Sequence, residues 1–210
     1  MRLPALEFSI GSDLKRDLAI ASADPAFKFT PLSGPERDRL NQFTNVRRRL
    51  DWLRGRNAMK QLLAMLGRDT DTSQVEFPHR QFSLTHAGEN AFSIADISGS
   101  AGIGIDYEPF RNVNPEITRL FLNSTELRWL ESCPETEVQH QIVRFWTIKE
   151  AAFKSYPSNA GLVLADFSIA EPGSRISDVT VAHGALGICV ACERYDEGYL
   201  SVAICEELPS

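Results

Sequence analysis

Two carboxylates stand two residues apart in a short apolar segment of the chain, at Asp106 and Glu108. In an extended strand, residues two apart project from the same face, so this spacing places both carboxylates together. Two such groups repel each other unless a cation lies between them, and oxygen ligands beside a phosphate suit Mg²⁺. Gly102 and Gly104 precede the acids on that face. We expect them to leave room for a ligand to approach the backbone. An Asp-x-Glu pair alone is common, and a strand end with solvated acids is the alternative interpretation.

A second group of polar residues follows a helical spacing. Glu150 and Lys154 are one helical turn apart and in line with Trp146, so an acid and a base share one face. His86 ends a strand-like segment beside a glycine turn. The alternatives are an exposed ion pair for the first two residues and a core histidine for the third.

Positive charge is concentrated in one segment, at Arg47, Arg48, Arg49, Arg54, Arg56 and Lys60. Such a run can form a local anion site, or it can be a solvated helix face. The chain as a whole carries a net charge of −6, which speaks against general affinity for nucleic acids.

The elements that position these residues follow from capping signals and hydrophobic periodicity. In the first half we expect a helix from the Ser33–Glu36 capping box, a longer helix after Asn45 ending at Gly67, and a hairpin with strands at 81–86 and 92–95. In the second half we expect a strand at 103–107, helices starting at Asn114, at Asn123 and at a Ser132–Glu135 box and running to Tyr156, and strands at 163–169, 186–192 and 200–205.

Helices followed by strands occur twice along the chain. This order predicts an α+β fold of two similar halves, residues 1–100 and 101–210, packed as a pseudo-dimer. The metal-binding carboxylates would lie in the second half.

The composition is that of an ordinary globular protein, with 210 residues, 43% hydrophobic and 24% charged. No apolar run reaches the roughly 18 residues of a membrane span. The N-terminus lacks the pattern of a signal peptide, and the four cysteines lie mainly in strand-like sequence, so we expect reduced core thiols and a cytoplasmic protein.

Three motifs, Ser83–His86, Gly104–Glu108 and Trp146–Lys154, occur in a specific order. Together they resemble the S-x-S-H, G-(I/V)-D-x-E and W-x-x-K-E-(A/S)-x-x-K signatures of the 4′-phosphopantetheinyl transferase superfamily. The resemblance covers about residues 33–170 and is closest in layout to the surfactin-type monomeric branch, in its Trp/Lys-Glu-Ala subtype. It implies a holo-[acyl-carrier-protein] synthase that transfers 4′-phosphopantetheine from coenzyme A to a serine of an apo acyl or peptidyl carrier protein, releasing 3′,5′-ADP.

The resemblance also implies residue roles. Asp106, Glu108 and Glu150 would bind Mg²⁺ together with the coenzyme A pyrophosphate, with Asp106 near the surface rather than in the core. Lys154 would contact the phosphate on the leaving side, and Glu150 or a water on the metal would accept the serine proton. The remaining residues expected on coenzyme A are Thr85, His86, Arg49 for the 3′-phosphate with Arg48 and Arg56 as alternatives, and Arg80 in place of a family lysine from a Gly-Lys-Pro tripeptide that this chain lacks.

Three other functions fit parts of this pattern. A coenzyme A-binding homologue without transferase activity would keep the same site. An unrelated metal-dependent phosphohydrolase would use the same acids but leaves the Trp146–Lys154 helix unexplained. A nucleic-acid-binding module built on the arginine run conflicts with the net charge. We therefore expect no nucleic-acid partner.

Overall fold

The computed structural model describes residues 1, 3–23, 31–99, 102–182, 184 and 186–207. It has two antiparallel sheets, one of three strands in the order β1-β3-β2 and one of five strands in the order β4-β8-β7-β6-β5. The predicted α+β class is confirmed.

The elements of the three-stranded sheet come first along the chain: α1 (Pro4–Leu14), β1 (Leu18–Ser22), α2 (Gly34–Asn41), α3 (Val46–Met65), β2 (Phe82–Ala87) and β3 (Asn90–Asp96). The second set is β4 (Gly102–Pro109), α4 (Pro115–Thr118), α5 (Ser124–Glu131), α6 (Glu135–Ser155), the short 3₁₀ helix η1 (Leu164–Asp166), β5 (Phe167–Ile169), β6 (Ile176–Val181), β7 (Leu186–Tyr195) and β8 (Gly198–Glu207).

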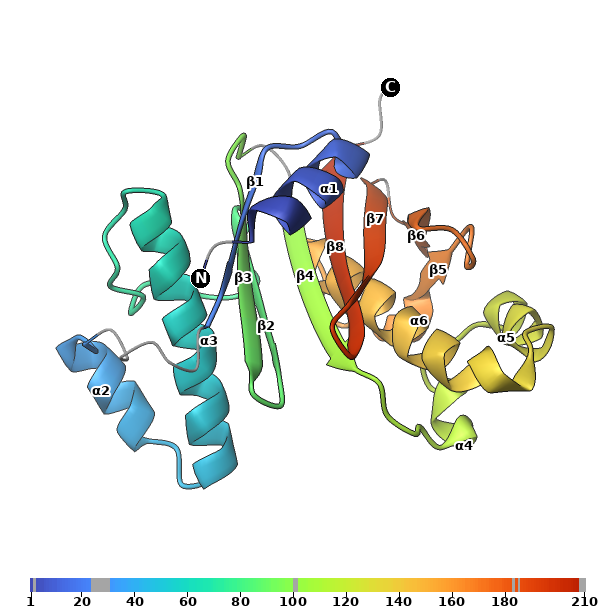
Figure 1. The fold of residues 1–210 in the computed structure, drawn as a ribbon, viewed down its shortest axis with the longest axis horizontal. Helices are drawn as coiled ribbons and strands as arrows, with labels where there is room; N and C mark the ends of the chain where they lie inside the picture. Colours follow the sequence, from blue (N-terminus) through green and yellow to red (C-terminus); the bar gives the residue numbers. More distant parts are fainter. Residues whose placement is uncertain (2, 24–30, 100–101, 183, 185, 208–210) are drawn as a thin grey trace.

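One long helix covers each sheet, as Figure 1 shows. Helix α3 packs on the strands of the smaller sheet and α6 packs on β4, β8 and β7. A separate apolar cluster joins the two sheets and α1, and it includes Ile105 and Tyr107 of β4. The opposite face of β4, which carries Asp106, therefore faces α6.

Most of the predicted elements form, with three differences in detail. The capping boxes at Ser33 and Asn123 are present. The box predicted at Ser132 is wrong, because the Ser132 hydroxyl donates to the carbonyl of Trp129 at the end of α5, and α6 begins at Glu135 without a side-chain cap. The strand predicted at 163–169 begins with η1. Elements α1, β1 and β6 were not predicted.

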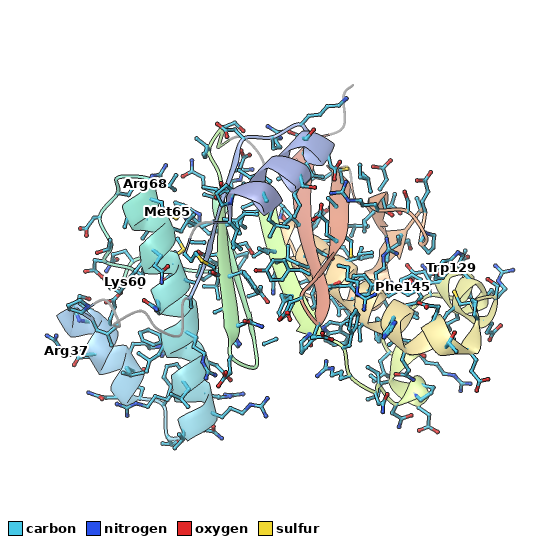
Figure 2. All side chains as sticks on the ribbon, viewed as in Figure 1. Arg37, Lys60, Met65, Arg68, Trp129 and Phe145 are labelled. Carbon is cyan, nitrogen blue, oxygen red and sulfur yellow. The ribbon has the colours of Figure 1, made fainter. Side chains whose placement is uncertain are left out.

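A buried glutamate–lysine pair ties a short helix to the long helix in the first set of elements. Glu36 is the capping-box residue of α2, and its Oε2 lies 2.7 Å from Nζ of Lys60 on α3, which is labelled in Figure 2. Burial alone raises the pKa of Glu36, but hydrogen bonds from Lys60, Thr72 and Ser33 outweigh it and lower the pKa to about 2.

The second set of elements repeats this arrangement. Glu126 is the capping-box residue of α5, and its Oε2 lies 2.7 Å from Nζ of Lys149 on α6. Both side chains are fully buried. The rings of Trp129 on α5 and Phe145 on α6, both labelled in Figure 2, also pack against each other, with centroids 5.5 Å apart. Each long helix is thus held to its neighbour by one buried ion pair.

All four cysteines are free thiols; Cys192 and Cys205 are buried, and the other two are partly buried. Among the described residues, no helix has the length and apolar character needed to cross a membrane.

Candidate active site

The Asp106 carboxylate on β4 forms an ion pair with Lys154 on α6. Nζ of Lys154 lies 2.7 Å from Oδ1 of Asp106 and 3.1 Å from the carbonyl oxygen of Ile105. The expectation that Asp106 lies near the surface is wrong, because only 5% of it is exposed. Helix α6 covers one side of the carboxylate and strand β2 covers the other.

Gly102 and Gly104, which precede Asp106 on β4, make room for the backbone of helix α6 and not for a ligand. A Cβ atom at Gly104 would lie 1.9 Å from the carbonyl oxygen of Ala151, and one at Gly102 would lie 2.1 Å from that of Ser155. The backbone of α6 therefore occupies the space that we expected to be open. This close packing brings Lys154 within reach of Asp106.

The two oxygens of the Asp106 carboxylate have different surroundings. Oδ1 accepts hydrogen bonds from Lys154 and from the Thr85 hydroxyl, which is 3.0 Å away. Oδ2 is buried and has no hydrogen-bond partner among the described residues. Buried polar atoms are normally paired, so an unpaired carboxylate oxygen is a candidate ligand for a cation.

Glu108 and Glu150 surround this carboxylate with further negative charge. Burial raises the pKa of Glu108; Arg111, whose Nη2 lies 3.3 Å from Oε2 of Glu108, opposes this, and Asp106 adds to it. Burial also raises the pKa of Glu150, with Lys154 opposing and Asp106 adding to the rise. The three acids repel one another, as expected of groups that share a cation.

Asp106, Glu108 and Glu150 suit a metal ion that takes part of its coordination shell from water or substrate. Within the part of the chain that the structure describes, no three His, Cys, Asp or Glu groups lie close enough to enclose a metal by themselves. Mg²⁺ usually takes only one or two protein carboxylates and fills its other positions with waters and substrate phosphates. The free oxygen of Asp106, with Glu108 or Glu150 as a second carboxylate, fits that kind of site.

A cavity of about 400 Å³ opens beside Lys154. It is lined by residues of α3, of the segment before β2, of β2, of the C-terminal end of α6 and of the segment after α6: Asp51, Trp52, Gly55, Arg56, Phe77, Pro78, His79, Phe82, Ser83, Leu84, His86, Phe153, Lys154 and Asn159. A second cavity of about 310 Å³ includes Glu108 in a mainly apolar lining from Arg111, Val113, Ile117, Phe121, Ile142, Val143 and Trp146. The first cavity thus borders Lys154, and the second borders Glu108.

Of the arginine and histidine residues expected to contact coenzyme A, two line the first cavity and three do not. His86 lines the first cavity and is exposed. Arg56 also lines it, but its guanidinium donates to the carbonyl oxygen of Thr72 and stacks 5.3 Å from the centre of the Trp52 ring. Arg48, Arg49 and Arg80 are exposed and are not among the residues that line this cavity.

Sequence reasoning missed several lining residues. Phe153, Asn159, Phe77 and His79 reach the first cavity from segments far apart in the sequence. Burial lowers the pKa of His79, and the nearby Arg68 lowers it further. Phe153 could have been predicted to line the cavity, because it stands one residue before Lys154 in the Trp146–Lys154 motif. Nothing in the sequence indicated the same for Asn159, Phe77 or His79.

Comparisons with known proteins bear on residues 102–205, which match the family model of the 4′-phosphopantetheinyl transferase superfamily. A search of curated protein sequences gave no significant match. Among solved structures, the chain is similar to the holo-[acyl-carrier-protein] synthase of Thermotoga maritima, with 20% identity, a TM-score of 0.44, and coverage of 51% of this chain and 64% of that one.

The chain is also similar to the acyl carrier protein synthase of Mycobacterium tuberculosis, with 18% identity, a TM-score of 0.36, and coverage of 51% of this chain and 97% of that one. The matched segment of the family model contains Asp106, Glu108, Glu150 and Lys154. The match to the superfamily model thus covers about half of this chain, the half that holds the three carboxylates, and the chain spans less than two thirds of the Thermotoga maritima structure.

Proposed function

We propose that this chain is a Mg²⁺-dependent 4′-phosphopantetheinyl transferase of the surfactin-type monomeric branch. It would move the phosphopantetheine arm of coenzyme A onto a serine of an apo acyl or peptidyl carrier protein and release 3′,5′-ADP. The observation that carries the proposal is the Asp106–Lys154 pair, in which Oδ2 of Asp106 has no partner among the described residues and Lys154 lines the first cavity. The superfamily match over residues 102–205 supports it.

Phosphoryl-type transfer depends on charge neutralisation and alignment more than on covalent catalysis. Asp106, Glu108 and Glu150 would hold Mg²⁺, which when bound neutralises pyrophosphate charge. Lys154 is only partly buried and carries its ammonium on a flexible stem, so it can turn from Asp106 to the phosphate on the leaving side. Glu150 lies near both Lys154 and Asp106, and it would accept the proton of the attacking serine.

The two cavities suggest where the reactants lie. The first has Trp52, Arg56 and His86 in its lining, which suit the base and phosphates of a nucleotide. We place coenzyme A there. The second cavity borders Glu108 with apolar residues. A carrier helix that packed on it would bring its serine to the carboxylates from the side opposite the leaving group.

We also propose the division into halves 1–100 and 101–210. All strands of the smaller sheet lie in the first half, and all strands of the larger sheet lie in the second. The repeated glutamate–lysine pairs, one in each half, support the same division.

The direct test is transfer to a carrier. The protein is incubated with coenzyme A, Mg²⁺ and a panel of apo carriers for fatty acid, polyketide and peptide assembly, and each carrier is weighed by mass spectrometry. We expect one carrier class to gain one phosphopantetheine. Omitting Mg²⁺ in the presence of a chelator, or replacing Asp106 with asparagine, should abolish the gain.

Two other outcomes would replace the proposal. Coenzyme A binding without a mass gain on any carrier would indicate a binding homologue. Release of phosphate from coenzyme A or from a simple ester, without labelling of a carrier, would indicate a phosphohydrolase.

A further inference from the structure

Strands β2 and β4 lie side by side but belong to different sheets. Two hydroxyl groups of β2 bridge them. Oγ of Ser83 accepts a hydrogen bond from the backbone N–H of Ile105 at 3.1 Å, and Oγ1 of Thr85 accepts one from the backbone N–H of Tyr107 at 3.3 Å. Side chains of one half thus pair with backbone donors on the outer edge of β4.

Thr85 makes one contact that Ser83 does not make. Its hydroxyl donates to Oδ1 of Asp106 at 3.0 Å. A hydroxyl has a single proton, and because Tyr107 N–H already points at its lone pairs, that proton is directed to the carboxylate. Thr85 is 4% exposed and Asp106 is 5% exposed, so water has little access to this bond.

The contact decides which carboxylate oxygen is free. Thr85 and Lys154 both donate to Oδ1, and Oδ2 is left without a partner among the described residues. If Lys154 turns toward a phosphate during the reaction, Thr85 is the group that still holds Oδ1. The Thr85 hydrogen bond then prevents the Asp106 carboxylate from rotating, so Oδ2 stays oriented as it is in this structure.

We infer that Thr85 is a positioning residue, which orients Asp106 as a metal ligand from the opposite half of the molecule. This inference rests on the proposed function, because it needs Asp106 to bind a metal. It gives Thr85 a role different from a contact with coenzyme A, because its hydroxyl already donates to Asp106 and accepts from the N–H of Tyr107. Leu84 and His86 of the same strand line the first cavity. Strand β2 would therefore both contact the nucleotide and orient Asp106 as a metal ligand.

The test compares two variants that lose the same backbone contact. Thr85→Val removes the hydroxyl and leaves the N–H of Tyr107 unpaired. Ser83→Ala leaves the N–H of Ile105 unpaired in the same way but does not touch Asp106. Both should lose similar stability in urea titrations. Only Thr85→Val should change metal binding.

Metal affinity is measured with Mn²⁺ by electron paramagnetic resonance, on full-length protein in the presence of coenzyme A. Groups that orient metal ligands typically contribute 10–100-fold to affinity, so we expect a loss of about 10-fold or more in Thr85→Val. Because Ser83 also lines the first cavity, the coenzyme A affinity of each variant is measured without metal, and Mn²⁺ affinities are compared at saturating coenzyme A. Under that condition Ser83→Ala should keep the wild-type Mn²⁺ affinity, and Thr85→Ser should recover most of the loss. Thr85→Ala carries the same expectation as Thr85→Val if the valine variant does not fold.

The results separate this inference from the proposed function. A wild type that binds Mn²⁺ and labels a carrier, together with a Thr85→Val variant of unchanged affinity, overturns the inference alone. An equal loss of affinity in Ser83→Ala also overturns it, because the effect would then come from the loosened strand. A wild type that neither binds Mn²⁺ nor labels any carrier overturns both.

Discussion

Replacing Lys149 with methionine would remove one charge from the buried pair between α5 and α6. Glu126 would keep the hydrogen bonds from the backbone N–H groups of Asn123 and Ile169, both at 2.9 Å, but lose its cation. Breaking a fully buried ion pair by removing one partner typically costs about 3–5 kcal/mol. We expect a loss of that size in the free energy of unfolding.

The loss should come mainly from the carboxylate that remains. Burial lowers the pKa of Lys149 even though Glu126 opposes this, so burying the ammonium is itself unfavourable. The double variant Lys149→Met/Glu126→Gln removes both charges. It should therefore recover part of the stability that the single variant loses.

Urea unfolding followed by circular dichroism measures these differences. For a chain of this length the single variant should also lower the melting temperature by roughly 6–20 °C. The matched control is Glu89→Gln, which removes a pair with Arg54 across 3.9 Å where Glu89 is 86% exposed. That change should cost less than about 1 kcal/mol. The reasoning is refuted if Lys149→Met loses no more stability than the control.

The remaining predictions concern acid stability, helix packing and catalysis. Because the pKa of Glu36 is about 2 when folded and 4.5 ordinarily, its ionised carboxylate, held by Lys60, Thr72 and Ser33, should contribute roughly 3 kcal/mol above pH 4.5 and lose this as the pH falls toward 2. Urea titrations across that range should show the loss, and a Glu36→Gln variant with the same acid dependence would contradict it. Gly104→Ala would place a methyl 1.9 Å from a carbonyl oxygen of α6, so we expect a loss of ~1–3 kcal/mol or more by calorimetry, with Gly34→Ala, where the space is open, as the neutral control. Lys154→Ala should slow carrier labelling by roughly 100- to 1000-fold in steady-state kinetics, and an unchanged turnover would remove it from the reaction.

Local rules were enough for the features that depend on neighbours in the sequence. Alternation along β4 placed Asp106 and Glu108 on one face, and one helical turn separated Glu150 from Lys154 on α6. The capping box at Ser33 forms as predicted, and a helix starts after Asn123 as predicted. These patterns have fixed periods, so a single chain segment carries the whole signal.

Secondary structure was predicted wrongly, or not at all, where one local sequence pattern fits two different structures. Strand β1 is a short apolar run without alternation, which periodicity cannot distinguish from part of a buried helix. Ser132 has the spacing of a capping box, but it lies at the end of α5 and its hydroxyl is used there. A neighbouring element decided both cases.

Contacts between distant segments were settled only by the tertiary structure. Nothing near Gly104 in the sequence says that the backbone of α6 fills the space beside it, or that Asp106 is buried as a result. The hydrogen bond from Thr85 to Asp106 joins two strands of different sheets. The sequence by itself determined which residue types stand at which local spacing, because strand and helix periods are properties of the backbone. Which of those side chains are buried, paired or left with a free oxygen depends on packing between elements, and only the folded chain decided that.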